Sequence, residues 1–199
     1  MTGIQIVRHR VAVAGWVTDA QTAKPIQGAE VTIDGMPPAF SRKLQYAPKT
    51  QRPDQAYTRE DGLFYFLDLP NGDYTFKISA PNSGKRYASA EAKASVARDG
   101  QGDLKMVTVK AALHSTTVKG KVTGPNHKTG VVLAEVRIKG SGERTYSDAG
   151  GEFVLSAIEP GTRTIQVFAQ GYRPASHVVR LAQPGALETV NVPLIREGG

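Results

Sequence analysis

Apolar and polar residues alternate along most of the chain, in short runs that end at Gly, Pro, Asn or Asp. Residues 10–18 place Val13, Gly15 and Val17 on one face and Trp16 on the other. A period of two is typical of a half-buried β-strand, and Gly and Pro between the runs favour turns. Further inward positions are expected at Ala29, Val31, Ile33, Phe64, Phe66, Tyr74, Phe76, Ile78, Val107, Val109 and Ala111. The pattern therefore predicts an all-β protein.

A turn that leads into a strand occurs twice. Thr58–Phe64 reads TREDGLF and Ser147–Phe153 reads SDAGGEF, so each copy has a small polar residue, an Asp and a Gly before an inward Phe. The surrounding apolar positions repeat as Val118, Gly120, Val122, Ala134, Val136, Ile138, Leu155, Ile165, Val167, Val190, Val192 and Leu194. An internal repeat of this length indicates two domains, which we place at residues 1–113 and 114–199.

The spaced motifs resemble the carboxypeptidase regulatory-like domain. The first copy carries GWVTD at 15–19, PIQGAEVTI at 25–33 and LPNGDY at 69–74, and the second carries GKVT at 120–123 and GY at 171–172. The resemblance implies two tandem seven-stranded Greek-key β-sandwiches of the prealbumin-like, or transthyretin-like, type. It leaves the function open, because such domains accompany peptidases, outer-membrane transporters, surface proteins and phage-tail-like particles.

The net charge of +7 is spread over both halves of the chain. Residues 1–113 hold 15 Lys and Arg against 11 Asp and Glu, and residues 114–199 hold 10 against 7. Dedicated nucleic-acid-binding proteins usually concentrate basic residues beside a recognisable motif, so no specific nucleic-acid partner is expected. The chain has no Cys, which excludes disulfides and a thiol nucleophile.

No constellation of residues in the sequence indicates catalysis or metal binding. The four histidines lie in separate segments, at His9, His114, His127 and His177. Asp61 and Asp148 stand near Gly as turn-forming residues do, whereas calcium requires more oxygen ligands. There is no Gly-x-Ser-x-Gly elbow, and the C-terminus lacks the tail that 5-hydroxyisourate hydrolase, an enzyme of the transthyretin-like fold, would require. We expect a non-enzymatic protein without cofactor or metal.

The first domain contains an insertion, residues 36–57, that has 16 more residues than its counterpart at 141–146. Its four prolines argue against a regular helix and favour an extended or polyproline-like loop. Phe40 and Tyr46 are candidate aromatic anchors, and the basic residues are Arg42, Lys43, Lys49 and Arg52. Loops on rigid sandwiches commonly carry binding function, and the alternative is a mobile surface loop.

The first domain also has an apolar surface that the second lacks. Trp16 takes the place of Lys121 on the outward face of the first strand. Three further outward residues, Leu63, Tyr65 and Leu67, correspond to Glu152, Val154 and Ser156. Because large exposed apolar patches usually mark contacts, either a partner or another part of this chain is expected to cover this surface.

Together these features predict a non-enzymatic structural or adaptor protein that docks into a larger assembly by protein–protein contacts. The expected partner-binding residues are Trp16, Phe40, Arg42, Lys43, Tyr46, Arg52, Leu63 and Tyr65. Family association extends the prediction to a phage-tail-like or contractile injection particle, and open edge strands extend it to homo-oligomers. The alternative is a glycan- or cell-surface-binding accessory module in which Trp16 stacks on sugar.

The N-terminal residues 1–10 lack the apolar core of a secretory signal, and no run approaches membrane-spanning length. We therefore expect cytoplasmic synthesis without a secretory signal. Incorporation into a particle, and an extracellular or surface location, remain compatible with the sequence.

Overall fold

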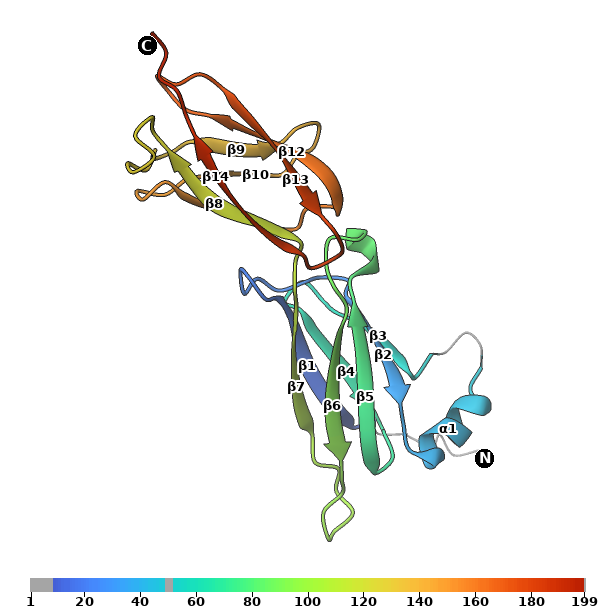
Figure 1. Ribbon diagram of the computed structural model, residues 1–199. Helices are drawn as coiled ribbons and strands as arrows, with labels where there is room; N and C mark the ends of the chain where they lie inside the picture. Colours follow the sequence, from blue (N-terminus) through green and yellow to red (C-terminus); the bar gives the residue numbers. More distant parts are fainter. Residues whose placement is uncertain (1–8, 49–51, 199) are drawn as a thin grey trace, which may run out of the picture. The chain divides into compact units, whose positions relative to one another are not determined.

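A computed structural model describes residues 9–48 and 52–198 (Figure 1). The chain divides into two compact units, which are considered separately below. The first unit comprises Met1–Asn82 and Ser89–Leu113, and the second comprises Ser83–Ala88 and His114–Gly199. The short segment Ser83–Ala88 therefore belongs to the second unit, although it lies between two strands of the first unit in the sequence.

The first unit is built from a three-stranded and a four-stranded sheet. Its strands are β1 (Val11–Asp19), β2 (Glu30–Gly35), β3 (Gln55–Tyr57), β4 (Leu63–Leu67), β5 (Gly72–Ser79), β6 (Ala90–Val96) and β7 (Val107–Leu113). The strand orders are β4-β1-β7 and β3-β2-β5-β6. Strand β4 is antiparallel to β1, and β7 is parallel to it. Helix α1 (Pro38–Gln45) belongs to this unit, and the 3₁₀ helix η1 (Pro81–Ser83) spans the boundary at which the segment Ser83–Ala88 begins.

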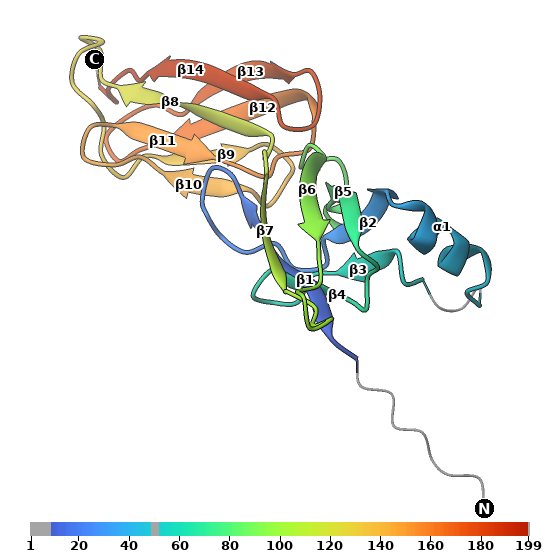
Figure 2. The same ribbon diagram turned by 90° about the horizontal axis from the view of Figure 1, so that it is seen from below.

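The second unit repeats this topology (Figure 2). Its strands are β8 (Thr117–Thr123), β9 (Glu135–Ile138), β10 (Arg144–Tyr146), β11 (Glu152–Leu155), β12 (Gly161–Phe168), β13 (Ala175–Leu181) and β14 (Leu187–Pro193). The orders β11-β8-β14 and β10-β9-β12-β13 match those of the first unit strand for strand. The predicted fold class of two seven-stranded sandwiches is confirmed.

The core of each unit lies between its two sheets and follows the alternation of the sequence. The buried ring of Phe66 in β4 packs against Phe64 of the same strand and Phe76 of β5, with ring centres 6.1 and 5.4 Å apart. In the second unit, Phe153 and Ile165 occupy corresponding buried positions. Side chains of this size each contribute on the order of 2 kcal/mol when they leave water, so the period-two pattern is sufficient to fix which faces pack together.

The small polar residue of each repeated turn has a structural role. Thr58 is 5% exposed, and its Oγ1 accepts a hydrogen bond from the Ala29 amide at 2.8 Å and donates one to the Ile26 carbonyl at 2.6 Å. Ser147 makes the equivalent two bonds in the second unit, at 2.9 and 2.6 Å. Each hydroxyl thus ties the turn to the segment that leads into β2 or β9, and satisfies buried backbone groups.

Tyr74 and Arg163 occupy equivalent positions and hold equivalent turns with different chemistry. The Tyr74 hydroxyl donates to the Pro70 carbonyl at 2.9 Å. The Arg163 guanidinium donates to the carbonyls of Glu159 and Pro160, both at 2.9 Å. Two different long side chains with a hydrogen-bonding head group thus satisfy carbonyl groups of the equivalent turns.

Ionisation of Tyr74 is expected to destabilise the first unit at high pH. Burial raises the pKa of its phenol to about 12, while the charge of Arg98 acts in the opposite direction. The phenol of the unfolded chain titrates near pH 10, so the folded state holds the proton more tightly. The resulting stability is complete below about pH 10 and is lost as the pH rises towards about 12. Unfolding free energies measured across this range should fall more steeply for the wild type than for Tyr74→Phe, and equal slopes would contradict the assignment.

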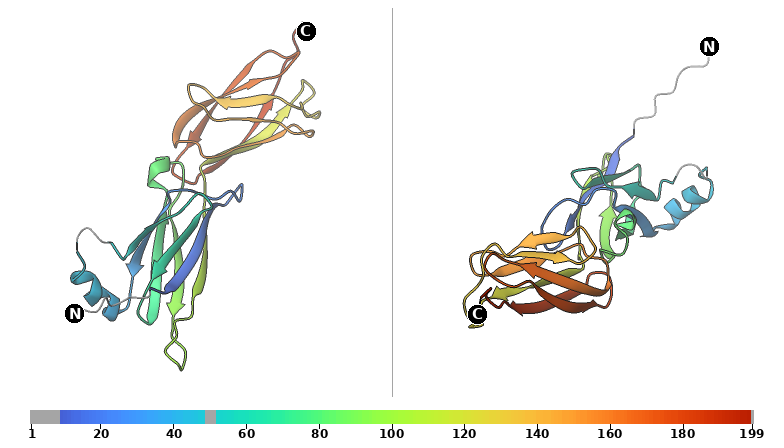
Figure 3. Two further views of the ribbon diagram at one scale, coloured as in Figure 1. Left: turned by 180° about the vertical axis from the view of Figure 1, so that it is seen from behind. Right: turned by 90° about the horizontal axis from the view of Figure 1, so that it is seen from above.

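The insertion contains helix α1, which corrects the prediction of an extended loop. Pro37 precedes the helix and Pro38 begins it, where the missing amide hydrogen costs no intrahelical bond and the fixed φ suits the first turn. Pro48 and Pro53 lie beyond the C-terminal end of the helix. All four prolines therefore fall outside the helix interior. Figure 3 shows α1 at the side of the first unit, next to β2.

Candidate docking site

The outward surface of the β4-β1 pair, which we call the outer face, carries exposed apolar side chains. Trp16 of β1 lies opposite Leu63 of β4 in the antiparallel register. Trp16 is 39% exposed, Tyr65 is 40% exposed and Leu67 is 39% exposed, while Leu63 is half-buried. The structure thus brings together three of the predicted site residues, Trp16, Leu63 and Tyr65, on one side of the sheet.

The second unit has charged residues at the equivalent pair of positions. Lys121 of β8 lies opposite Glu152 of β11, where the first unit has Trp16 opposite Leu63. The two units share the same strand order, so the fold itself is compatible with either pair. The apolar pair of the first unit is consequently not a requirement of the sandwich.

Arg59 extends the outer face at the turn before β4. Its guanidinium carbon lies 5.3 Å from the centre of the Tyr65 ring, and its Nη2 donates to the Tyr65 hydroxyl at 3.3 Å. A guanidinium over an aromatic ring is attracted to that ring, so Arg59 stabilises this position of Tyr65. The sequence prediction missed Arg59, although its place directly after Thr58 in the repeated turn put it next to this strand.

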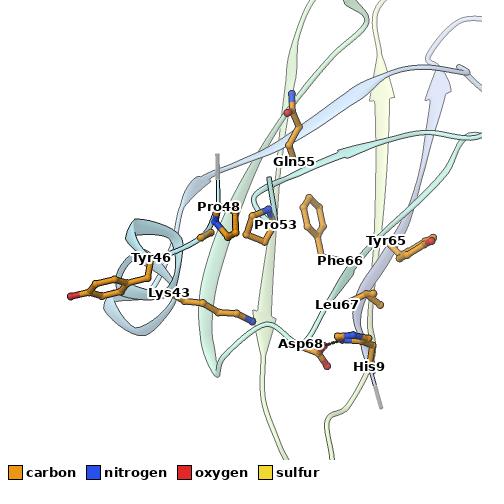
Figure 4. A pocket seen from close by; sticks show the side chains of 11 residues that line it. His9, Lys43, Tyr46, Pro48, Pro53, Gln55, Tyr65, Phe66, Leu67 and Asp68 are labelled. Carbon is orange, nitrogen blue, oxygen red and sulfur yellow. Dashed lines mark hydrogen bonds and ion pairs between the residues drawn. The ribbon is translucent and has the colours of Figure 1, made fainter. Parts of the chain in front are cut away.

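A hollow of about 630 Å³ opens beside β4 (Figure 4). One side is formed by consecutive residues of β4 and its C-terminal end, and the other by α1 and the segments that flank the undescribed residues 49–51. Its lining residues are His9, Lys43, Tyr46, Ala47, Pro48, Pro53, Gln55, Tyr65, Phe66, Leu67 and Asp68. Three predicted site residues, Lys43, Tyr46 and Tyr65, therefore contribute to it, and Tyr65 belongs to both the hollow and the outer face.

A histidine and a carboxylate are paired in the hollow. His9 Nδ1 and Asp68 Oδ2 are 2.5 Å apart, and the Asp68 carboxylate also accepts a bond from the Arg10 amide at 2.9 Å. Burial opposes ionisation of Asp68, but the bonds from Arg10 and His9 and the charges of His9 and Lys43 outweigh it, so the pKa of this carboxyl lies below its ordinary value. In Figure 4 the Lys43 side chain extends from α1 towards this pair.

The two aromatic anchors predicted in the insertion have different environments. Phe40 is 1% exposed and packs edge-to-face on Tyr74 with ring centres 5.8 Å apart, which corrects its expected role at a partner. Tyr46, at the C-terminal end of α1, is 87% exposed. Phe40 is therefore the residue that attaches α1 to the sheet, and Tyr46 is the accessible aromatic residue.

The basic residues predicted to bind a partner also differ from one another in exposure and in ion pairing. Arg42 and Lys43 are exposed in the last turn of α1, where positive charge suits the helix dipole. Arg52 instead pairs with the buried Asp54 at 2.8 Å, and its hydrogen bond lowers the pKa of that carboxyl. The positive charge of Arg52 is therefore partly neutralised by a residue of the same unit. Lys49 lies outside the described residues.

The acidic residues of the repeated turns bind backbone amides. Asp61 Oδ1 accepts a bond from the Leu63 amide at 3.0 Å, and Asp148 Oδ1 accepts bonds from the amides of Gly150 and Glu152 at 2.9 and 2.8 Å. No group of three or more His, Asp or Glu residues that could hold a metal ion occurs within residues 9–48 and 52–198. Over the same residues, no helix has the length and apolar character needed to cross a membrane.

Comparison with solved structures gives distant resemblances. The shaft pilin SpaA of Lactobacillus rhamnosus GG is 14% identical, with 96% of this chain and 98% of that chain covered and a TM-score of 0.45. A streptococcal ancillary pilin is 17% identical over 96% of this chain and 63% of its own length, with a TM-score of 0.41. The Bacillus anthracis TIE protein is 12% identical over 94% of this chain, with a TM-score of 0.39, and this chain spans 34% of its length.

A search of curated proteins found no significant match. The model of the carboxypeptidase regulatory-like domain matches residues 117–194, which extend from the start of β8 to just beyond the end of β14. The first unit has the same number and order of strands. Residues 117–194 are therefore similar to a carboxypeptidase regulatory-like domain, and the first unit has the same strand order as this region.

Proposed function

We propose that this protein is a non-enzymatic structural or adaptor protein that docks into a larger assembly through the outer face of its first unit. The observation that carries the proposal is the Trp16–Leu63 pair, which stands where the second unit has Lys121 and Glu152. Burying the exposed part of a Trp side chain at a partner contributes on the order of 2 kcal/mol, and such aromatic residues commonly dominate binding energy.

The second unit supplies the design for a test. In the double variant Trp16→Lys/Leu63→Glu, the first unit carries the pair of residues that the same topology already accommodates in the second unit. Loss of a central aromatic anchor together with introduced charge is expected to weaken partner binding by at least about 30-fold. The measurement is a mild pull-down of the full chain from its native cells, read by mass spectrometry, with affinities determined for the proteins that are recovered.

A matched control removes an exposed apolar side chain from the second unit instead. Val154 is 51% exposed at the position equivalent to Tyr65, so Val154→Ser should leave the recovered partners unchanged. Circular dichroism verifies that both variants are folded. Undiminished recovery of every partner by Trp16→Lys/Leu63→Glu would contradict the proposal.

A narrower form of the proposal places the protein in a phage-tail-like or contractile injection particle. It rests on family association, and docking through the outer face is compatible with it. Sedimentation of purified particles, followed by detection of this chain in the particle fraction, tests the narrower form. Its absence from every particle preparation would leave only the general docking proposal.

Glycan or cell-surface binding is the second candidate, because Trp16 and Tyr65 are both about 40% exposed on the same side of the sheet. Flat aromatic rings of this kind can stack on the apolar faces of sugars. A glycan array with the wild type and Trp16→Ala separates the two functions. Binding to a glycan that disappears in Trp16→Ala would favour this candidate over docking to protein.

A further inference from the structure

Strand β4 has an open edge that faces the hollow. Antiparallel pairing with β1 uses the backbone groups of Phe64 and Phe66, and the same alternation turns those of Leu63, Tyr65 and Leu67 away from β1. The repeated turn satisfies both backbone groups of Leu63. Its amide donates a hydrogen bond to the Asp61 carboxylate, and its carbonyl accepts one from the Arg59 amide at 2.9 Å. For the amides and carbonyls of Tyr65 and Leu67, the described residues provide no hydrogen-bond partner.

The composition of this edge is unusual for a strand exposed to solvent. Natural proteins protect open edges with charged residues, Pro or bulges, because unpaired backbone groups pair with other chains. β4 consists of Leu, Phe, Tyr, Phe and Leu, without a charged residue or Pro. The equivalent strand β11 begins with Glu152 and is one residue shorter. The sequence of β4 therefore retains the features of a strand that pairs.

The insertion forms a second wall beside this edge. Tyr65, Leu67 and Asp68 line one side of the hollow, and Tyr46 and Pro48 line it from the insertion (Figure 4). The hollow therefore places unpaired backbone groups next to aromatic and apolar side chains. An extended peptide requires both, because main-chain bonds provide affinity and side-chain pockets provide specificity.

We infer that an extended segment of a partner protein binds in this hollow as an additional strand, hydrogen-bonded to Tyr65 and Leu67. This inference rests on the proposed docking function and specifies its mode. The added strand would place alternate side chains between β4 and the insertion, in contact with Tyr46 and Pro48. Its neighbouring side chains would point outward, towards solvent or the exposed side of Tyr65.

Lys43 favours an acidic residue in the partner segment, because the Asp68 carboxylate of the same hollow is already bonded to His9 and to the Arg10 amide. Lys43 lines the hollow without an ion pair to any described residue, Arg42 is exposed in the same turn of α1, and Arg59 lies over the Tyr65 ring. Pairing β4 with the β4 of a second copy would bring these like charges together, which is unfavourable. The occupant is therefore a segment from another protein, with apolar residues at alternate positions and an acidic residue near Lys43.

The test uses the full chain and a phage-displayed library of random twelve-residue peptides. Enriched peptides should combine alternating apolar residues with at least one Asp or Glu. In complex with the best synthetic peptide, hydrogen exchange of the Tyr65 and Leu67 amides should slow by at least about tenfold, because both become hydrogen-bonded. Lys43→Glu should weaken binding by about tenfold through loss of attraction and added repulsion. Failure to enrich peptides above the background of the library would overturn the inference.

Two substitutions at Leu67 distinguish peptide binding through main-chain hydrogen bonds from peptide binding through the Leu67 side chain. Leu67→Pro removes an amide that makes no bond within the described part of the unit, so the fold should persist while peptide binding is lost. Leu67→Ala keeps the amide and should retain most of the binding. A peptide that is N-methylated at alternate residues tests the same bonds without changing the protein, and it should not bind. Equal binding by Leu67→Pro and Leu67→Ala, or by the methylated and unmethylated peptides, would overturn the inference.

The native pull-down distinguishes this inference from the proposed function. Loss of the partner in both Trp16→Lys/Leu63→Glu and Leu67→Pro supports both. If Trp16→Lys/Leu63→Glu loses the partner and Leu67→Pro retains it fully, the inference of strand addition is wrong, and docking through the outer face stands. Retention in both variants would remove the docking function itself, and a second copy of the chain as the captured partner would contradict the acidic-segment assignment.

Discussion

Replacing Gly120 with Ala is expected to destabilise the second unit by at least about 3 kcal/mol. A Cβ at this position would overlap the carbonyl oxygen of Val190 and lie 2.7 Å from its carbonyl carbon. Both atoms are backbone of β14, which pairs in parallel with β8 at this residue. A side chain could rotate away, but here the two strands themselves must separate, and the core packed on them must follow.

Chemical denaturation followed by circular dichroism measures this loss. The matched control is Gly142→Ala, which makes the same chemical change in the same unit where nothing lies within 4 Å of the new Cβ. The control should remain within about 0.5 kcal/mol of the wild type. Similar unfolding free energies for the two variants would show that the close approach of β8 and β14 is not required.

The Phe40→Ala variant is expected to lose about 3 kcal/mol and to detach α1 from the first unit. Phe40 is the buried residue of this eight-residue helix, and it contacts Tyr74. A helix this short is not stable in water without packing, so removal of the ring should release the whole segment. The hollow would then lose one wall, and partner binding would fall although Phe40 itself is buried within the unit.

Tyr46→Ala provides the comparison, because Tyr46 is 87% exposed in the same insertion. Its unfolding free energy should stay within about 0.5 kcal/mol of the wild type, whereas hydrogen exchange across Pro38–Gln45 should accelerate only in Phe40→Ala. Both substitutions should reduce peptide binding, one by releasing the helix and the other by removing a contact. Equal stability of the two variants would contradict the assignment of Phe40 as the attachment of α1.

The repeat allowed much of the fold to be predicted because each inward position had a second example. Phe64 and Phe153 follow the same turn, and both are buried on the central side of their sheet. The counterpart of the insertion in the second domain is 16 residues shorter, so no such comparison constrained the structure of the extra residues. The number of prolines in the insertion did not predict its structure. Their positions, at the start of α1 and beyond its end, decide whether a helix can form.

The alternation of residues and the repeat determined the two sandwiches, their strand faces and the contrast between Trp16 and Lys121. Only the tertiary structure placed Phe40 in the core and Tyr46 in solvent, since both are aromatic residues in one aperiodic segment. Only the tertiary structure also brought His9, Lys43 and Asp68 together beside an open strand edge. Strand faces follow from local periodicity, whereas a site assembled from three distant segments depends on how sheets and helix pack.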